Sequence, residues 1–249
     1  MPDPLIPTEA TRGFTRASEF KILDILRGLV TRKSEVLEIG CGTGMFVSIP
    51  LGYLGIKILG IDSDPRSIEY AIRNNPHHDV SFICSSGEDF KTERRFDLII
   101  CNYVLEHLAH PLTVLQNISR LLKHDGTAFV CIPNGFGWHE IEYFIPRLLV
   151  KTRFGKKLQE YVLSRKLRDS LNPDSPHIQF FTVSRFTELA QQSNLRILKR
   201  INLEVADGPV SNRTVLKIPT LAKWNVDKAG KVPASIVASW IFLLGHIDG

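Results

Sequence analysis

The chain has 249 residues, of which 43% are hydrophobic and 23% are charged. These values are typical of an ordinary soluble protein that buries a substantial core in one domain, and they exclude a disordered chain. The N-terminus has no charged-then-apolar leader pattern, so we expect a cytoplasmic protein. Its cysteines form no C-x-x-C pair and are expected to be reduced and buried. They are Cys41, Cys84, Cys101 and Cys131.

The net charge of +5 is unevenly distributed along the chain. Residues 1–135 carry 14 basic and 16 acidic side chains, a net charge of −2, whereas residues 136–249 carry 17 basic and 10 acidic ones, a net charge of +7. Anionic partners are therefore expected to meet the C-terminal half.

Strand and helix patterns alternate over the first half of the chain. A proline-rich tail leads into an amphipathic helix expected over 16–31. Strands are then predicted at 35–39, 56–61, 79–83, 96–101 and 126–132, and helices at 44–53, 65–74 and 111–122. This alternation predicts a parallel sheet that is covered by helices on both faces.

The pattern changes after residue 135. Residues 138–170 look helical and basic, and two prolines follow them. The remaining expectations are a helix at 184–193, a strand at 195–204, an irregular segment at 206–233 and a final strand at 236–244, which is too short to span a membrane. We therefore expect one domain over 1–249, with a core of 34–134 and 177–249 and a helical lid or insertion at 136–172.

Three glycines at alternate positions follow the first predicted strand, in the run Glu38-Ile39-Gly40-Cys41-Gly42-Thr43-Gly44. A strand that ends in a glycine turn and leads into a helix brings backbone N–H groups close to a ligand. The spacing is not the dinucleotide fingerprint G-x-G-x-x-G, because Met45 stands where its third glycine would be.

This run resembles the first motif of the class I S-adenosylmethionine (SAM)-dependent methyltransferases, E/D-x-G-x-G-x-G. Glu38, Gly40, Gly42 and Gly44 match that motif in full. The resemblance implies SAM as the cofactor, bound by these residues and Cys41. It also implies a Rossmann-like, doubly wound α/β fold with a seven-stranded, mostly parallel sheet. The implied strand order is 3-2-1-4-5-7-6, with the last strand antiparallel and the basic helical insertion between strands 5 and 6.

Asp62 ends the second predicted strand, at the edge of an open parallel sheet where ligands bind. Its carboxylate can accept hydrogen bonds from two ribose hydroxyls, and the neighbouring Ser63 is expected at the cofactor. Asp64 stands before Pro65 and suits the N-cap of the next helix.

A third candidate loop, Ser86-Gly87-Glu88, follows the third predicted strand. Many methyltransferases of this class carry an aspartate that reads the adenine amino group at the position of Ser86. A serine can accept that hydrogen bond without a charge, and the resemblance implies that Gly87 and Glu88 flank the adenine. The alternative interpretation is an ordinary polar loop.

Residues 96–108 resemble the F-D-x-(I/V)-x-x-x-x-V-L-E-H segment of the methyltransferases that act on quinones, sugars and other small metabolites, the type 11/23 subfamily. The resemblance implies that Asn102 and Tyr103 contact the cofactor. His107 either packs beside the methionine end of the cofactor or takes the proton from an acceptor hydroxyl. His177 opens a segment that resembles a second family signature, H-x-x-x-F-T, and is the other catalytic candidate.

Eight basic residues against one acidic residue make 144–168 the most basic segment of the chain. Apolar residues recur among them at helical spacing, which gives one apolar and one positive face. Such a helix can cover the active site as a lid. It can also lie on an anionic membrane surface or contact a lipid-linked substrate, or it can bind the phosphates of a nucleic acid. Peripheral attachment to the inner membrane surface therefore stays open.

The leading hypothesis is transfer of a methyl group from SAM to a small-molecule acceptor, such as a hydroxyl of a saccharide, a quinone precursor or a lipid-linked intermediate. No zinc-ligand spacing is present, and no metal is expected. RNA methylation is the alternative that the basic half favours, but the N-P-P-Y and Pro-Cys signatures are absent. A SAM-binding protein without turnover is the other alternative. The sequence makes no prediction of the oligomeric state.

Overall fold

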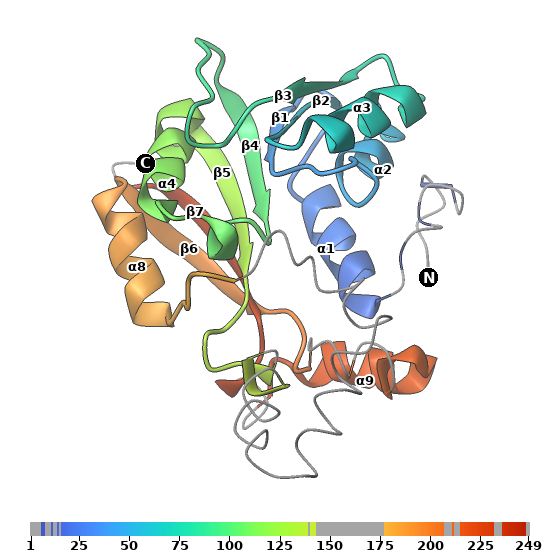
Figure 1. Cartoon of the computed structure of the whole chain (residues 1–249), viewed down its shortest axis with the longest axis vertical. Coiled ribbons are helices and arrows are strands. Elements are labelled where there is room, and N and C mark those ends of the chain that lie inside the picture. Colours follow the sequence, from blue (N-terminus) through green and yellow to red (C-terminus); the bar gives the residue numbers. More distant parts are fainter. Residues whose placement is uncertain are drawn as a thin grey trace.

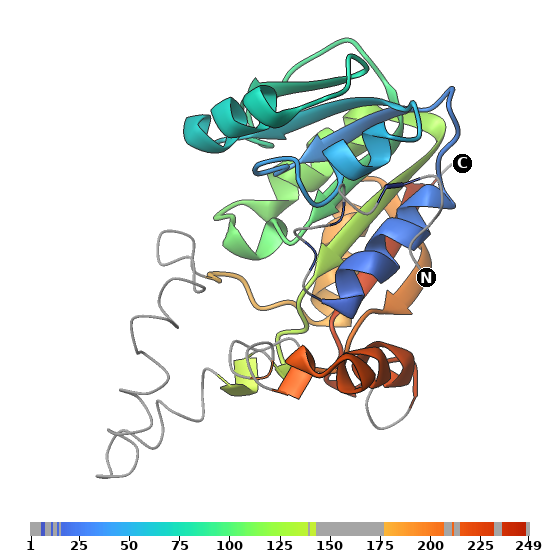
Figure 2. The ribbon, with the colours of Figure 1, turned by 90° about the vertical axis from the view of Figure 1, so that its right-hand side faces the viewer.

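The centre of the protein is a single sheet with helices on both faces (Figures 1 and 2). The computed structural model describes residues 6–7, 11, 14, 16–138, 140–142, 177–206, 211, 215–231 and 236–247. Within these residues, seven strands pair in the order β3-β2-β1-β4-β5-β7-β6. The strand order implied by the resemblance is therefore confirmed.

The elements lie close to the predicted ranges. The strands are β1 (Glu35–Ile39), β2 (Lys57–Asp62), β3 (Val80–Cys84), β4 (Phe96–Asn102), β5 (Leu122–Ile132), β6 (Leu195–Asn202) and β7 (Trp240–His246). The helices are α1 (Ala17–Arg27), α2 (Ser48–Gly52), α3 (Pro65–Asn74), α4 (Pro111–Leu121), α8 (Val183–Gln192) and α9 (Pro219–Lys228), with 3₁₀ turns η2 (Leu105–His107) and η4 (Val215–Lys217).

Strand direction follows from how the strands are connected. β1 pairs in parallel with β2 and with β4, and β2–β3 and β4–β5 are also parallel. β7 runs antiparallel to both β5 and β6. The carboxyl ends of β1 to β6 therefore meet at one edge of the sheet, and β7 begins at that edge.

Alternate residues of each strand supply two separate cores. Leu37 and Ile39 of β1 pack on the face that α4 and α8 cover. Val36 of the same strand packs on the opposite face, against residues of α1, α2 and α3. Because side chains alternate along a strand, burial of both faces requires apolar residues throughout, as predicted for these central strands.

Four predicted elements are wrong in extent, and one segment contains a helix that was not predicted. The helix expected over 16–31 already ends at Arg27, and the strand expected over 126–132 already begins at Leu122. The helix expected over 44–53 begins only at Ser48, because Gly44 has a left-handed φ of 72° and still belongs to the turn. The final strand runs later than 236–244. The segment 206–233, expected to be irregular, contains η4 and α9. The basic segment 144–168 lies outside the described residues, so its predicted helices are not described.

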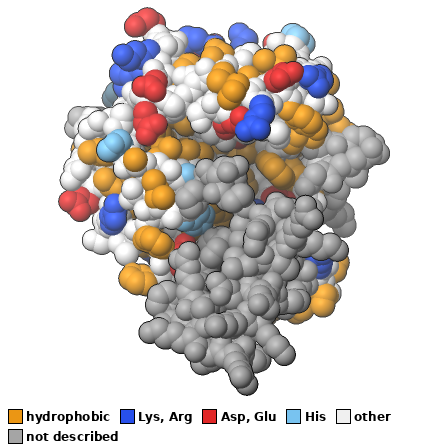
Figure 3. Space-filling view, viewed as in Figure 1, with side chains coloured by type: hydrophobic (Ala, Val, Ile, Leu, Met, Phe, Trp, Pro, Cys, Tyr) orange, Lys and Arg blue, Asp and Glu red, His pale blue; other side chains and the backbone are white. Residues whose placement is uncertain are grey.

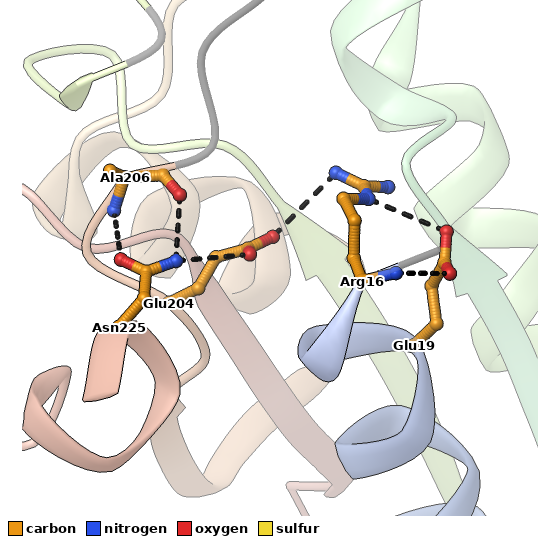
Figure 4. Close-up of polar contacts among 5 residues, drawn as sticks. All are labelled: Arg16, Glu19, Glu204, Ala206 and Asn225. Carbon is orange, nitrogen blue, oxygen red and sulfur yellow. Dashed lines mark hydrogen bonds and ion pairs between the residues drawn. The ribbon is translucent and has the colours of Figure 1, made fainter. Parts of the chain in front are cut away.

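A polar network connects α9 with the start of α1 (Figure 4). The Asn225 side chain accepts a hydrogen bond from the Ala206 amide at 2.7 Å and donates to the Ala206 carbonyl at 2.8 Å. It also donates to the buried Glu204 carboxylate at 3.4 Å, and that carboxylate lies 3.7 Å from the Arg16 guanidinium. Burial raises the pKa of Glu204, and Arg16 opposes this shift. These contacts hold α9 in a defined orientation beside α1.

The sequence also predicts that the last apolar run does not span a membrane and that the cysteines are reduced and buried. None of the helices in the described ranges is long and apolar enough to cross a membrane. Cys41, Cys101 and Cys131 are buried, as expected, whereas the expectation of burial is wrong for Cys84, which is exposed at the end of β3.

Candidate active site

Four loops that carry predicted cofactor residues meet at the carboxyl edge of the sheet. The strand register aligns Ile39 of β1 with Ile61 of β2 and with Cys101 of β4. It also aligns Asp62 with Cys84 of β3. The turns after β1, β2, β3 and β4 are therefore neighbours in space. This brings together all the predicted cofactor residues: Glu38, Gly40, Cys41, Gly42, Gly44, Asp62, Ser63, Ser86, Gly87, Glu88, Asn102 and Tyr103.

The glycine turn after β1 needs its glycines for two reasons. Gly40, Gly42 and Gly44 have φ values of 71°, 52° and 72°, a region that other residues rarely adopt. A Cβ on Gly40 would overlap the Val104 side chain, whereas a Cβ on Gly42 would meet no atom within 4 Å. The turn is thus packed tightly at Gly40 and faces open space at Gly42. That space is where a ligand could approach the backbone.

The expectation that bare amides of this turn hold the ligand is wrong for four of its residues. The amides of Gly40 and Cys41 both donate to the Ile61 carbonyl, at 2.8 and 3.0 Å. The Gly44 amide donates to the Cys41 carbonyl at 2.9 Å, and the Gly42 amide donates to Asp62. Three of these donors attach the turn to β2, and the Gly44 amide closes the turn on itself, because a buried N–H needs a partner within the fold.

Asp62 is the carboxylate at the centre of this arrangement. Its Oδ2 accepts the Gly42 amide at 2.7 Å, and its Oδ1 accepts the Asp64 amide at 2.9 Å. A carboxylate oxygen can accept more than one hydrogen bond, so both oxygens keep capacity for hydroxyl donors. Asp64 caps α3 by accepting from the amides of Arg66 and Ser67, each at 3.2 Å, as predicted.

Glu38 is buried at the end of β1 and bonds to the start of α2. Its carboxyl is buried and accepts hydrogen bonds from the amide (3.1 Å) and the hydroxyl of Ser48. Burial raises the pKa of Glu38 to about 8. The thiol of Cys41 is also buried, and burial raises its pKa. The side chains of Glu38 and Cys41 therefore shape the turn from inside.

The loop after β3 is attached to α4 and closed by a local hydrogen bond. Ser86 donates from its hydroxyl to Asp89 at 2.7 Å and accepts the Asp89 amide at 3.0 Å. Asn117 of α4 donates to the carbonyls of Gly87 and Glu88, at 2.9 and 2.8 Å. The backbone of this loop is thereby held rigidly beside the end of β3.

The end of β4 places a buried polar atom at the same edge. The Asn102 Oδ1 atom is buried and accepts no hydrogen bond among the described residues. Tyr103 follows with a left-handed φ of 55°, and its amide donates to the Cys131 carbonyl at 3.0 Å. A buried acceptor without a donor is costly, and a ligand N–H or O–H can supply that donor.

The two candidate catalytic histidines lie together. The ring centroids of His107, in η2, and His177 are 5.0 Å apart at 67°. His177 Nδ1 lies 3.1 Å from a carboxylate oxygen of Glu140. The Glu106 carbonyl accepts the amides of Ile178 and Gln179, at 2.8 and 3.0 Å, which attaches the returning chain to η2.

The same cluster is the place where the described chain could bind a metal ion. One ligand atom each of Glu106, His107 and His177 lies within 4.8 Å of the others. The sequence pattern did not indicate this grouping, since 70 residues separate the two histidines.

Sequence reasoning missed the residues that support the site from a distance. Ser48, Asn117 and Glu140 each bond to a predicted site residue or its loop. No motif marks them. Their only signal is a polar residue within or beside a helical pattern, which is too common to be specific.

The fit of the site to SAM rests on three of these observations: the open space at Gly42, the acceptor capacity of Asp62 and the buried Oδ1 atom of Asn102. A nucleoside needs a carboxylate for its hydroxyls, and an α-amino group needs an acceptor. The residues present suit both needs.

Comparison with known proteins agrees with this geometry. A family model described as a methyltransferase domain matches residues 13–200. The chain is 33% identical over 121 residues to the ubiquinone biosynthesis O-methyltransferase of Glaesserella parasuis, covering 45% of this chain and 50% of that protein. It is 29% identical over 106 residues to the protein of the same name from Rickettsia akari, covering 41% of each. The chain thus spans half or less of the length of these curated relatives.

Solved structures share the fold. PKMT2 from Rickettsia typhi superposes with a TM-score of 0.60 at 19% identity, covering 94% of this chain and 54% of that chain. A second structure of that protein, in complex with AdoHcy, superposes with a TM-score of 0.57 at 20% identity over the same shares. Since the family model covers most of the chain and the sheet has the strand order that its motifs imply, the protein belongs to the class I SAM-dependent methyltransferases.

Proposed function

We propose that this protein transfers a methyl group from SAM to a hydroxyl of a small-molecule acceptor. The observation that carries the proposal is the pairing of Asp62 with the Gly42 amide beside open space. This pairing puts an acceptor for ribose hydroxyls next to the part of the turn that a ligand can reach.

In this proposal the cofactor lies across the four loops. Asp62 accepts the ribose hydroxyls, with Ser63 at its side, and the rigid loop of Ser86, Gly87 and Glu88 flanks the adenine. Asn102 Oδ1 accepts from the α-amino group. Glu38 contributes through Ser48, by holding the start of α2 in place behind the turn.

The histidine cluster receives the acceptor. SAM, when bound, supplies an electrophilic methyl group on its sulfonium. Glu140 accepts the Nδ1–H of His177 and so fixes the orientation of the ring, and in this proposal Nε2 of that ring takes the hydroxyl proton. His107 packs against that ring and limits its rotation. Alignment of the two reactants supplies much of the rate enhancement in such a transfer.

The type of acceptor is supported by the curated relatives, which are named as O-methyltransferases of ubiquinone biosynthesis. A quinone precursor with a phenolic hydroxyl is therefore the first acceptor to test, followed by a saccharide and a lipid-linked intermediate. The His177–Glu140 pair favours a hydroxyl, because a hydroxyl must lose a proton when its oxygen is methylated.

The test measures cofactor binding and transfer separately. SAM should raise the melting temperature of the wild-type protein and of Glu140→Gln, but not that of Asp62→Ala. Labelled SAM should then transfer its methyl group to a catechol-type acceptor with the wild-type protein. Label found in RNA instead would favour the RNA methyltransferase. Binding of SAM without any labelled product in a broad extract would favour a SAM-binding protein without turnover, and no thermal shift would reject both enzymes.

A further inference from the structure

A group of large apolar side chains is exposed on α9 and the residues next to it. Ile218 and Trp224 expose 51% and 53% of their surfaces, and Leu221 between them is also exposed. These three residues recur at a spacing of three, so they lie close together on one side of the helix. Ile236, before β7, is 65% exposed. Single exposed apolar residues are ordinary, but a contiguous group indicates an interaction surface.

Lysines also occur in α9 and next to it in the sequence. They are Lys217, Lys223, Lys228 and Lys231, with Asp227 as the one acidic residue of α9. A shallow hollow is lined by Thr220, Lys223, Trp224, Asp227, Lys228 and Lys231. Basic and hydrophobic side chains lie side by side in Figure 3, at the place that α9 occupies in Figure 1. We call Ile218, Leu221, Trp224 and these four lysines the α9 surface.

Helix α9 is fixed to the protein through two buried residues. Asn225 and Ala229, one helical turn apart, are buried. Asn225 bonds to Ala206 and Glu204, as described above. The α9 surface is therefore presented outward by contacts that do not involve its own side chains.

We propose that the α9 surface binds an anionic lipid bilayer. A helix at a membrane interface places aliphatic and tryptophan side chains at the boundary between headgroups and acyl chains, and its lysines bind anionic headgroups. Trp224 lines the same hollow as Lys223 and Lys228, so both kinds of side chain meet at one place on α9. A single-stranded nucleic acid binds to several aromatic side chains on which successive bases stack, whereas Trp224 is the one aromatic side chain of the α9 surface as defined above.

The α9 surface lies near the carboxyl edge of the sheet, where the candidate active site is. The α9 segment connects Asn202, the last residue of β6, with Trp240, the first residue of β7, and these two residues pair. Trp240 also pairs with Ile132 at the carboxyl end of β5. The Asn134 side chain donates to the Ile236 carbonyl at 2.7 Å. The α9 surface thus lies at the same end of the molecule as the site loops, so an acceptor dissolved in the bilayer would enter from that side. This last consequence rests on the proposed function, whereas lipid binding does not.

The test is sedimentation of the full chain with large vesicles of phosphatidylcholine, with or without one quarter phosphatidylglycerol. The wild-type protein should sediment with the anionic vesicles only, and less at high salt. Leu221→Ser combined with Trp224→Ala should weaken binding about tenfold, through lost apolar burial. Lys223→Glu combined with Lys228→Glu should weaken it more than tenfold, because each lysine near the surface contributes roughly a factor of five.

Matched controls change the same residue types elsewhere. Tyr70→Ala removes an exposed aromatic side chain from α3, and Lys57→Glu reverses an exposed charge on β2. Both should bind vesicles like the wild type. The proposal is overturned if the control variants and the α9 variants bind anionic vesicles equally. It is also overturned if the wild type does not bind anionic vesicles. If the wild type instead retains RNA in a salt-sensitive way and does not bind vesicles, and if the lysine variant loses RNA retention, the α9 surface is assigned to nucleic acid.

Discussion

Asp62 accepts a hydrogen bond of 2.7 Å from the backbone amide of Gly42. A carboxylate at the end of β2 thereby fixes the conformation of the turn at the end of β1. The same carboxylate accepts the Asp64 amide at the start of α3. Asp62 is thus both a structural acceptor and the proposed ribose acceptor, and substitutions must distinguish these two roles.

We expect Asp62→Asn to fold but to bind SAM about 10- to 100-fold more weakly, because hydrogen bonds to a charged acceptor contribute roughly 1.5–3 kcal/mol. The asparagine oxygen can still accept one of the two backbone amides. Isothermal titration with SAM measures the loss. Asp64→Ala is the control: removal of this N-cap should cost about 1 kcal/mol of stability and leave the SAM affinity unchanged. Equal affinity of Asp62→Asn and the wild type would contradict the assignment.

Gly40 and Gly42 should respond differently to the same change. Gly40→Ala places a methyl group against Val104 at a left-handed φ, and we expect a loss of about 2–4 kcal/mol in urea unfolding. Val104→Ala in the same chain should restore part of that loss. Gly42→Ala meets no neighbour, so its stability should fall by only about 1 kcal/mol. Its SAM affinity should fall instead, because the added methyl group occupies the open space. A larger stability loss for Gly42→Ala than for Gly40→Ala would be inconsistent with this geometry.

Glu38 should make stability depend on pH. Burial raises its pKa to about 8, so the folded protein holds a proton that the unfolded chain releases near pH 4.5. The stabilisation is complete below pH 4.5 and is lost as the pH rises toward 8, at about 1.4 kcal/mol per unit of pKa difference.

Glu38→Gln should therefore show a flatter dependence of unfolding free energy on pH. Denaturant titrations at several pH values between 5 and 8 test this, with the wild type losing stability relative to the variant as the pH rises. Parallel curves for the two proteins would show that Glu38 titrates normally in the folded state.

The His177–Glu140 pair should matter for transfer but not for cofactor binding. We expect His177→Asn to lower kcat about 100-fold or more, the usual contribution of a general base. Glu140→Gln should lower it less, because the ring keeps a hydrogen-bond partner. His124 lies 3.1 Å from Asp125 in a similar but exposed pair, so His124→Asn is the matched control. If His177→Asn lowers the SAM affinity as well as kcat, His177 has a structural role.

Asn225 should support both stability and the orientation of α9. Asn225→Ala removes two hydrogen bonds to Ala206 and one to the buried Glu204 carboxylate, which should cost roughly 2–3 kcal/mol. Thermal unfolding measures this, and Asn74→Ala, which loses one exposed bond on α3, is the control. Vesicle binding should fall with Asn225→Ala even though this residue is not on the α9 surface. Unchanged stability and unchanged vesicle binding would show that the network does not hold the helix.

The sequence by itself determined the central sheet, the glycine turn and the Asp64 cap. These features depend on local rules: alternating burial along a strand, left-handed glycines and an acceptor before a helix. Position 62 could also be placed, because the end of a parallel strand always lies at the ligand edge.

Only the tertiary structure decided which side chains meet. Ser48 lies on Glu38, Asn117 holds the loop of Gly87, and Glu140 bonds to His177 across 37 residues. Helix α9 also depends on such contacts, since its sequence has little helical preference and Asn225 needs Ala206 and Glu204 as partners. Local periodicity determines which residues form strands and turns, but a hydrogen-bond partner far along the chain is chosen only when the packed elements bring the two groups within about 3 Å.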